Sequence, residues 1–211
     1  MNTKTGIAMW DARFNTPDYV YGTEPNAFLV AQSHRLQPGM RALALADGEG
    51  RNGVWLAQQG LDVLSVDGSE TALAKARALA AARGVTLETE QADLAHWDFG
   101  QQHFDLVAAI FIQFAGPELR QRLFAAMRDS LKPDGLLILQ GYRPEQLDYG
   151  TGGPKQIEQL YTAAMLREVF AGMEILHLEE HDSVISEGCG HSGMSALVDL
   201  VARKPAANAD N

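Results

Sequence analysis

The fold of this 211-residue chain is indicated most clearly by one segment, Leu43-Ala44-Leu45-Ala46-Asp47-Gly48-Glu49-Gly50-Arg51-Asn52-Gly53. An apolar run, typical of a buried strand, stops at a glycine-rich turn, and a pattern compatible with a helix follows at once. Gly48, Gly50 and Gly53 spell G-x-G-x-x-G, and Asp67 follows at the spacing at which an acidic side chain can hold a ribose hydroxyl. The segment therefore predicts a loop that cradles a nucleotide-type cofactor.

Two cofactors are compatible with this segment. The literal glycine pattern indicates NAD, but a strand, a glycine turn, a helix and an acidic strand end would equally serve S-adenosylmethionine. The rest of the chain has to distinguish them.

Composition and charge limit the class of protein. With 46% apolar and 21% charged residues, the chain can form one full-sized core, and we expect a single domain over residues 1–205 with a disordered tail at 206–211. A net charge of -10 without a dense basic cluster argues against nucleic acid and favours a small-molecule partner. Sequence alone leaves the oligomeric state open.

No membrane or metal signal stands out in the sequence. The N-terminus lacks the apolar core of a signal peptide, and the longest apolar run, Leu106 to Ile112, is too short to span a bilayer, so we expect a cytoplasmic protein. Cys189 is the only cysteine, and His177, His181 and His191 lack a compact ligand spacing. We therefore predict neither an internal disulfide nor a metal site.

Strand-like and helix-like segments alternate along most of the chain. Strands are expected at 41–46, 61–66, 85–90, 104–112 and 135–140, and helices at 51–59, 70–83 and 118–131. Ser69 is a good N-cap for the second of these helices, and Gly84 can end it. Lys132-Pro133-Asp134-Gly135 is expected to turn the chain into the fifth strand. Such alternation predicts a doubly wound, mostly parallel sheet with helices on both faces.

The end of the chain breaks this rhythm. After a helix ending at 165–170, strands are expected at 173–181 and 194–202, with no crossover helix between them. Asp182 to Gly193 is glycine-rich and is expected to be a loop that joins antiparallel strands. This pattern resembles the class I S-adenosylmethionine-dependent methyltransferase fold, a seven-stranded sheet in the order 3-2-1-4-5-7-6 with the last strand antiparallel. A dehydrogenase would need a further parallel strand and a substrate domain.

Particular motifs extend the resemblance over nearly the whole chain. The segments at 45–52, 66–69, 92–94, 131–135 and 151–154, with the ends at 19–29 and 187–193, look like the small bacterial methyltransferases grouped with tellurite-resistance and thiopurine methyltransferases. The resemblance implies S-adenosylmethionine as cofactor. Two positions depart from the family pattern: Ala44 stands where an acidic residue is usual, and Ala46 where the first glycine is usual. Asp47 can replace the missing acid.

The cofactor residues follow from these motifs. Asp67 suits a ribose diol or caps the following helix, and Asp93 lies where the family holds the adenine amino group but could only shape a turn. Residues 1–38 are expected to form a lid or only a packed helix, through the aromatic group Trp10, Phe14, Tyr19, Tyr21 and Phe28. The full expected cofactor set is Trp10, Tyr21, Asp47, Gly48, Gly50, Asn52, Asp67, Gly68, Ser69, Asp93, Leu94 and Phe111.

The acceptor side is less determined. Gln113 and Phe111 follow the fourth strand, and Arg143, Gln146 and Tyr149 follow the fifth, close to the edge where ligands bind in such sheets. Gln113 and His191 are the candidate catalytic residues. His191 or Glu187 would be the base for an oxygen or nitrogen acceptor, whereas a soft sulfur, selenium or tellurium acceptor needs none, and His191 could then be structural.

Three functions therefore stay open at this stage. The first is methyl transfer to a small molecule with a soft nucleophile. The second is a noncatalytic S-adenosylmethionine-binding protein, motivated by Ala44 and Ala46, and the third is an NAD-linked oxidoreductase.

Overall fold

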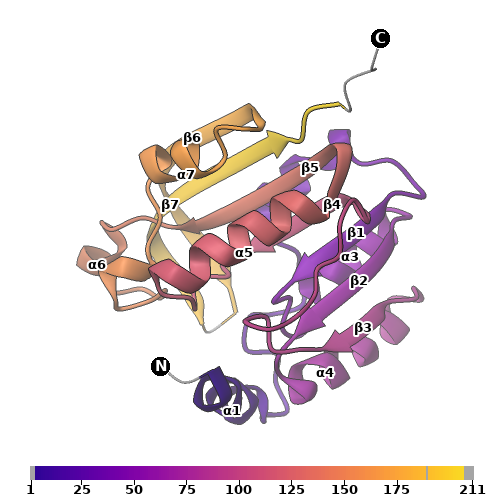
Figure 1. Cartoon of the computed structure of the whole chain (residues 1–211). Helices are drawn as coiled ribbons and strands as arrows, with labels where there is room; N and C mark the ends of the chain where they lie inside the picture. Colours follow the sequence, from indigo (N-terminus) through magenta and orange to yellow (C-terminus); the bar gives the residue numbers. More distant parts are fainter. Residues whose placement is uncertain (1–2, 189, 207–211) are drawn as a thin grey trace.

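A computed structural model describes residues 3–188 and 190–206 of the chain (Figure 1). The helices are α1 (Thr3–Phe14), α2 (Ala27–Ala31), α3 (Arg51–Gln58), α4 (Glu70–Ala82), α5 (Pro117–Ser130), α6 (Gln146–Tyr149) and α7 (Ala163–Val169). The strands are β1 (Arg41–Leu45), β2 (Asp62–Asp67), β3 (Glu88–Gln91), β4 (Phe104–Ile110), β5 (Leu131–Tyr142), β6 (Glu174–Glu187) and β7 (His191–Arg203). Most of the predicted helices and strands are present, with ends shifted by a few residues.

The sheet has the predicted strand order, β3-β2-β1-β4-β5-β7-β6. Neighbours from β3 to β5 are parallel, and β7 is antiparallel to both β5 and β6. The prediction of a doubly wound sheet with an antiparallel end is thus confirmed, and this end is the feature that a dehydrogenase domain lacks.

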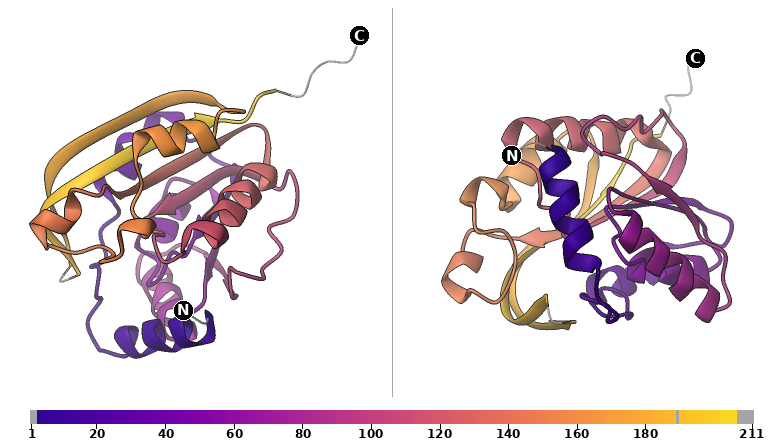
Figure 2. Two further views of the ribbon diagram at one scale, coloured as in Figure 1. Left: turned by 60° about the vertical axis from the view of Figure 1, so that its left-hand side comes forward. Right: turned by 90° about the horizontal axis from the view of Figure 1, so that it is seen from below.

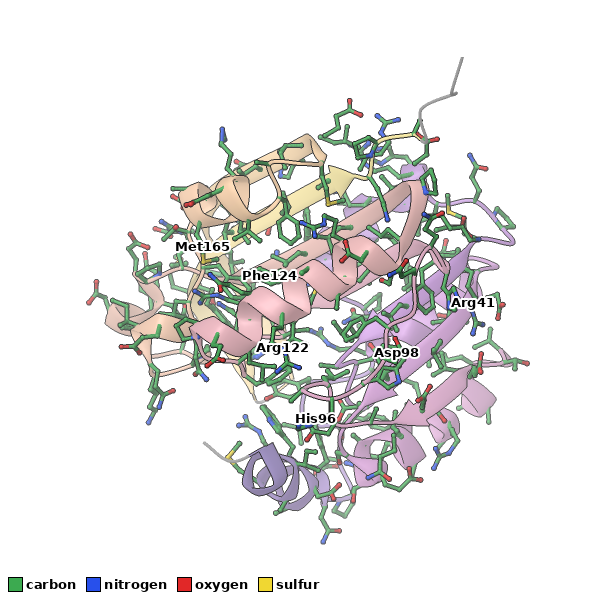
Figure 3. The ribbon with its side chains drawn as sticks, in the orientation of Figure 1. Arg41, His96, Asp98, Arg122, Phe124 and Met165 are labelled. Atoms are coloured by element: carbon green, nitrogen blue, oxygen red, sulfur yellow. The ribbon has the colours of Figure 1, made fainter. Side chains whose placement is uncertain are left out.

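Alternate residues of the strands enter two separate cores, one on each face of the sheet. Leu43 and Leu45 of β1 face a cluster that includes Phe124 of α5 and Phe170, whereas Ala42 and Ala44 face one that includes Leu56 of α3. The period of two along β1 produces this division. Phe124 of α5 and Met165 of α7, labelled in Figure 3, both belong to the first of these cores.

The parallel strands end together at one edge of the sheet, and α1 crosses that edge (Figure 2). A Cβ added to Gly68, just after β2, would lie 2.9 Å from Ile7 of α1, and one added to Gly48 would lie 3.4 Å from the Phe14 ring. Helix α1 therefore covers the loops in which parallel α/β sheets bind their ligands.

The prediction of a loop over residues 182–193 is wrong for most of that segment. β6 continues to Glu187 and β7 begins at His191, with Asp182 paired to Ala196 and Glu187 to His191. The glycines suggested a loop, but pairing with the partner strand outweighs that local preference. The long hairpin brings its tip to the carboxyl edge, where Gly190 N donates to Val20 O at 3.3 Å.

The Lys132–Gly135 turn forms inside β5, not before it. β5 already pairs at Leu131, opposite Phe104, and resumes at Leu136, opposite Leu106. The positive φ of 61° falls on Asp134 and not on the glycine. Hydrogen bonds between this segment and Lys204 hold the bulge in place. At the other edge, β3 begins at Glu88, three residues later than expected.

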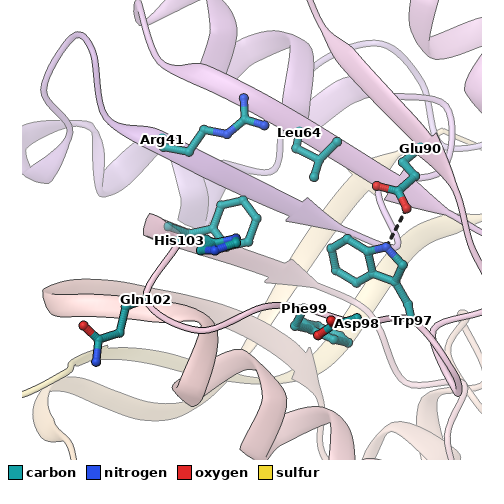
Figure 4. Close-up of a pocket in the computed structure, with 9 residues that line it drawn as sticks. Arg41, Leu64, Glu90, Trp97, Asp98, Phe99, Gln102 and His103 are labelled. Carbon is teal, nitrogen blue, oxygen red and sulfur yellow. Dashed lines mark hydrogen bonds between the residues drawn. The ribbon is translucent and has the colours of Figure 1, made fainter.

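The connection from β3 to β4 contains no helix. It crosses the sheet as a loop, and Arg122 of α5 holds it by donating to Ala95 O at 2.8 Å (Figure 3). A cavity of about 570 Å³ lies beneath this loop, lined by Arg41, Leu64, Glu90, Trp97, His103 and Phe104 among others (Figure 4). Arg41 and Phe104 are the first residues of their strands, so this cavity opens on the side of the sheet away from Gly48.

Among the described residues, no helix has the length and apolar character needed to cross a membrane. Residues 207–211 of the expected disordered tail lie outside the described part of the chain.

Candidate cofactor and acceptor site

Glycine is required at Gly48 and at Gly50 for different structural reasons. Gly50 has φ 87°, and a Cβ there would approach Ala76 Cβ of α4 to 2.5 Å, so the packing of α3 on α4 requires it. Gly48, at φ 59°, faces only the Phe14 ring of α1. Gly48 is therefore the position of the loop that a ligand under α1 can approach.

Asp67 joins this loop to the end of β2. Its Oδ2 accepts from Gly48 N at 2.9 Å and its Oδ1 from Ser69 N at 2.8 Å. Ser69, and not Asp67, caps α4, because the Ser69 side chain accepts from Ala72 N. Burial raises the pKa of Asp67, against the backbone hydrogen bonds, which lower it. Gly68 also donates from its backbone, and no cationic side chain among the described residues pairs with Asp67, so the carboxylate keeps acceptor capacity for a hydroxyl donor.

Helix α1 is attached directly beside Asp67. Asp11 Oδ1 accepts from Ser69 Oγ at 2.5 Å and from Thr71 N at 3.3 Å, at the positive end of α4. On the same helix Trp10 stacks on Phe14 with ring centroids 5.6 Å apart. Trp10 and Gly68 thus lie close to the glycine loop, and a contact of either with the cofactor is still a proposal.

Asp47 turns inward. Its carboxylate accepts from Gly53 N at 3.1 Å and from Ser65 Oγ at 3.0 Å, beneath the start of α3. Burial raises the pKa of Asp47 to about 7, although these two hydrogen bonds lower it. The preceding Ala46 has φ 48°, a conformation that suits the glycine usual at this position. Asp47 therefore stabilises the loop from below, where it already has two hydrogen-bond donors.

Asp93 shapes a turn after β3. Its Oδ1 accepts from Ala95 N at 3.0 Å, and its Oδ2 lies 3.2 Å from His96 Nδ1. Leu94 is buried in the core on the α5 face. Asp93 thus has a local structural role in this turn. A contact between Asp93 and adenine is still a proposal.

A strap at residues 18–22 connects α1 to the rest of the site. Glu49 of the glycine loop accepts from Val20 N at 2.8 Å and Tyr21 N at 3.4 Å, and it pairs with Lys75 at 2.7 Å. The same Lys75 ammonium donates to Asp18 O at 2.7 Å. The cofactor loop itself therefore holds the strap closed.

Asn26 is the centre of a buried polar network. Its Nδ2 donates to Gln140 Oε1 at 2.7 Å and to Glu187 Oε1 at 2.8 Å, while its Oδ1 caps α2 by accepting from Leu29 N. Its backbone N–H donates to Asn52 Oδ1 at 3.0 Å. Asn52 therefore has a structural partner, and Asn26 links α2, α3, β5 and the hairpin.

Glu187 and Arg51 form a buried ion pair, 2.7 Å apart, with side chains 10% and 7% exposed. Burial alone would raise the pKa of Glu187, but the neighbouring His191, Arg51 and Asn26 together outweigh it and lower that pKa to about 2. A fixed negative charge thus lies at the carboxyl edge of the sheet.

His191 lies against this charge inside a ring of aromatic side chains. The imidazole centroid is 4.5 Å from Tyr21, 4.5 Å from Phe111 and 5.6 Å from Tyr142. Its Nδ1 is 3.7 Å from Glu187 Oε2, an ion-pair distance too long for a hydrogen bond. Burial lowers the pKa of His191 more than Glu187 raises it, so the imidazole is neutral near pH 7.

Two buried polar atoms here have no hydrogen-bond partner among the described residues: His191 Nδ1 and Tyr142 Oη. Burial raises the pKa of Tyr142, so its hydroxyl keeps its proton. Unpaired buried polar groups are rare in proteins and gather at sites that bind ligands. The aromatic cluster of Tyr21, Phe111, Tyr142 and His191 is therefore the candidate acceptor site.

Gln113 is engaged elsewhere. Its Oε1 accepts from Tyr142 N at 2.6 Å, and its Nε2 donates to Tyr142 O at 2.9 Å and Gln159 O at 3.1 Å. Both of its N–H groups are used, so its evident role is to position β5 and Tyr142. Arg143 pairs with Asp182, and Gln146 bonds to the backbone of Gly152 and Ala196.

The residues around Asp67 fit a bound S-adenosylmethionine. Ribose hydroxyls donate, Asp67 offers unused acceptor capacity beside Gly48, and α1 shields the place from water. Among the described residues there is no group of three or more His, Cys, Asp or Glu that could hold a metal ion.

Comparison with known proteins supports this assignment. Residues 42–135 match the family model of a methyltransferase domain. The chain is 30% identical to the glycine/sarcosine N-methyltransferase of Aphanothece halophytica, over 65% of this chain and 58% of that protein. It is 32% identical to the carboxy-S-adenosyl-L-methionine synthase of Nautilia profundicola, over 39% and 35%. The chain thus spans between about a third and three fifths of these relatives.

Solved structures share the fold at low identity. A protein that converts a disulfide bond into a thioacetal group during echinomycin biosynthesis is similar over 99% of this chain and 94% of its own, with a TM-score of 0.76 and 19% identity. TehB from Haemophilus influenzae follows at 0.71 and 19%, over 92% of this chain and 65% of its own. The predicted class I methyltransferase fold is confirmed, and S-adenosylmethionine is supported as the cofactor.

Proposed function

We propose that this protein, whose residues 42–135 match the family model of a methyltransferase domain, transfers a methyl group from S-adenosylmethionine to a small-molecule acceptor. The observation that carries the proposal is Asp67, a buried carboxylate bonded to Gly48 N at the carboxyl edge of the sheet and covered by α1. The Asp67 oxygens hold the ribose, and Gly48 leaves room for the methionine part.

We further propose a soft nucleophile, namely sulfur, selenium or tellurium, as the acceptor atom. The fold of the echinomycin protein, which acts on a disulfide, and of TehB supports this class. The glycine/sarcosine N-methyltransferase makes nitrogen the competing class. The aromatic rings of Tyr21 and Phe111 give the acceptor an apolar environment, which suits polarisable atoms.

The chain mainly has to align the reactants and exclude water. S-adenosylmethionine supplies an electrophilic methyl group on a sulfonium, whose positive charge disperses during transfer. Helix α1 and the strap at residues 18–22 act as the lid over both ligands, and Glu49 keeps that lid on the cofactor loop. Effective alignment of this kind can supply several kcal/mol, on the order of 7 to 11, of the barrier reduction.

Calorimetry and turnover test the proposal together. S-adenosylhomocysteine should bind and raise the melting temperature, NAD should do neither, and labelled S-adenosylmethionine should methylate at least one acceptor in a set of thiols, thiopurines and chalcogen oxyanions. Binding of NAD alone would overturn the proposal.

A noncatalytic S-adenosylmethionine-binding protein is the second candidate. Ala46 holds a strained positive φ in the loop, and the [4+2]-cyclase SpnF shares this fold with a TM-score of 0.67. Binding of S-adenosylhomocysteine without methylation of any acceptor would favour that candidate.

A further inference from the structure

The Glu187 carboxylate has more contacts than a structural ion pair with Arg51 requires. Arg51 and Asn26 hold its two carboxylate oxygens separately, and the oxygen that Arg51 holds is also the one that faces His191. A buried ion pair of this kind brings little net stability. Its geometry, by contrast, fixes one carboxylate against one imidazole at the acceptor site.

We propose that Glu187 is the positioning residue of a base, His191, and that the acceptor is a protonated thiol or selenol rather than an anion that is already ionised. This inference rests on the proposed methyl transfer and narrows its acceptor class. It separates the roles of the two residues that the sequence left as alternative bases.

The negative charge of Glu187 selects the tautomer of His191. A proton on Nδ1 faces the carboxylate and is favoured there, so the lone pair lies on Nε2. The ring carbon next to Nε2 lies near Gly152, since a Cβ on Gly152 would lie 3.7 Å from His191 Cδ2. The acceptor's proton therefore goes to Nε2, the ring nitrogen that does not face Glu187.

In the proposed step, one S–H bond and one carbon–sulfur bond break, and one N–H bond and one carbon–sulfur bond form. The thiol S–H proton passes to His191 Nε2 while the sulfur electron pair forms the bond to the methyl carbon. The bond between that carbon and the sulfonium breaks, and its electron pair stays on the sulfur of S-adenosylhomocysteine. The imidazolium is stabilised by Glu187, and it later releases its proton to water.

The charged and titratable side chains around His191, which include Tyr21 of the strap, act in both directions. Glu187 of β6 favours its protonated form, whereas burial and the positive charges of Arg51 and Arg13 disfavour it. The phenol of Tyr142 stays protonated. His191 therefore begins neutral, as a base must, and gains its main stabilisation from Glu187 once it is charged.

A pair of thiols of similar size tests the inference. 4-Nitrothiophenol is ionised at neutral pH and needs no base, whereas phenylmethanethiol is protonated there. Glu187→Gln and His191→Gln should each lower kcat/KM for phenylmethanethiol by about 30-fold or more, and leave 4-nitrothiophenol within about threefold. With phenylmethanethiol, Glu187→Gln should also move the acidic limb of the pH profile to lower pH, since the variant no longer stabilises the imidazolium.

A matched control is Glu179→Gln, an exposed glutamate on the same strand, which should change neither rate. An equal loss for both thiols in either variant, or no loss for phenylmethanethiol, would overturn the inference. If Glu187→Gln does not fold, His191→Gln decides, because it keeps the pair of Glu187 with Arg51. Wild-type protein that binds S-adenosylhomocysteine but methylates neither thiol also overturns it, whereas loss of that binding is the failure of the proposed function.

Discussion

Replacement of Asp47 by asparagine should change how the stability of the protein depends on pH. Asp47 carries a carboxyl whose pKa burial raises to about 7 in the folded chain, whereas an unfolded aspartate titrates near 3.8. A raised pKa means that folding favours the protonated form. This contribution to stability is complete below pH 3.8 and is lost as the pH rises through 7.

The size of the effect follows from these two pKa values. Between pH 5 and pH 8 the folded state loses most of the proton that it holds, while the unfolded state has already released it. By linkage, the wild-type free energy of unfolding falls by about 2 to 3 kcal/mol over this range through Asp47 alone. Asparagine cannot ionise, and its Oδ1 can still accept from Gly53 N and Ser65 Oγ.

Urea unfolding followed by circular dichroism at pH 5 and pH 8 measures this effect. Because other buried groups also titrate, the quantity of interest is the difference between Asp47→Asn and wild type at each pH. That difference should favour the variant by about 2 to 3 kcal/mol more at pH 8 than at pH 5. Asp62→Asn, whose side chain is exposed at the start of β2, is the control. A difference that does not change with pH would refute the argument.

Three further predictions concern the site. Asp67→Ala should weaken binding of S-adenosylhomocysteine by about 1 to 3 kcal/mol through loss of two charge-assisted hydrogen bonds, and unchanged affinity in calorimetry would remove Asp67 from the site. Gly48→Val should abolish that binding, because the side chain meets Phe14 at a φ of 59°; normal binding by the folded variant would show that this loop is not the cradle. Asn26→Asp should destabilise the fold by about 2 to 4 kcal/mol, since a carboxylate would then face Glu187 without the donor that now bridges them; urea unfolding within about 0.5 kcal/mol of wild type would contradict this.

Local patterns predicted the parallel half of the sheet well. The apolar run at 43–46, the cap at Ser69 and the stop at Gly84 each depend on residues close in sequence, and all three are present in the structure. The missing crossover helix near the end of the chain indicated an antiparallel pair, and the resemblance to class I methyltransferases implied the order of the strands. The hairpin was different, because its glycines indicated a loop whereas pairing between β6 and β7 continues almost to the tip.

Sequence patterns named candidate site residues mainly where these follow strands, and their contacts with ligands stay predictions. Asp67 and Gly48 were found because the carboxyl ends of parallel strands define a ligand site. Asn26, Arg51 and Glu187 lie up to 161 residues apart, and no spacing in the sequence joins them, so the buried network they form was not predicted. Phe28 was expected with the lid, but it packs on the sheet face against His177, with ring centroids 5.7 Å apart.

The contact between Val20 and Gly190 has a consequence for synthesis on the ribosome. The strap is translated about 170 residues before the tip of the hairpin that completes the acceptor site. At typical elongation rates of about 5 to 20 residues per second, the nascent strap spends roughly 10 to 30 seconds outside the tunnel without that partner. During this time the glycine loop and Glu49 can already receive it. We therefore expect the cofactor half of the site to form on the ribosome, and the acceptor half to form last.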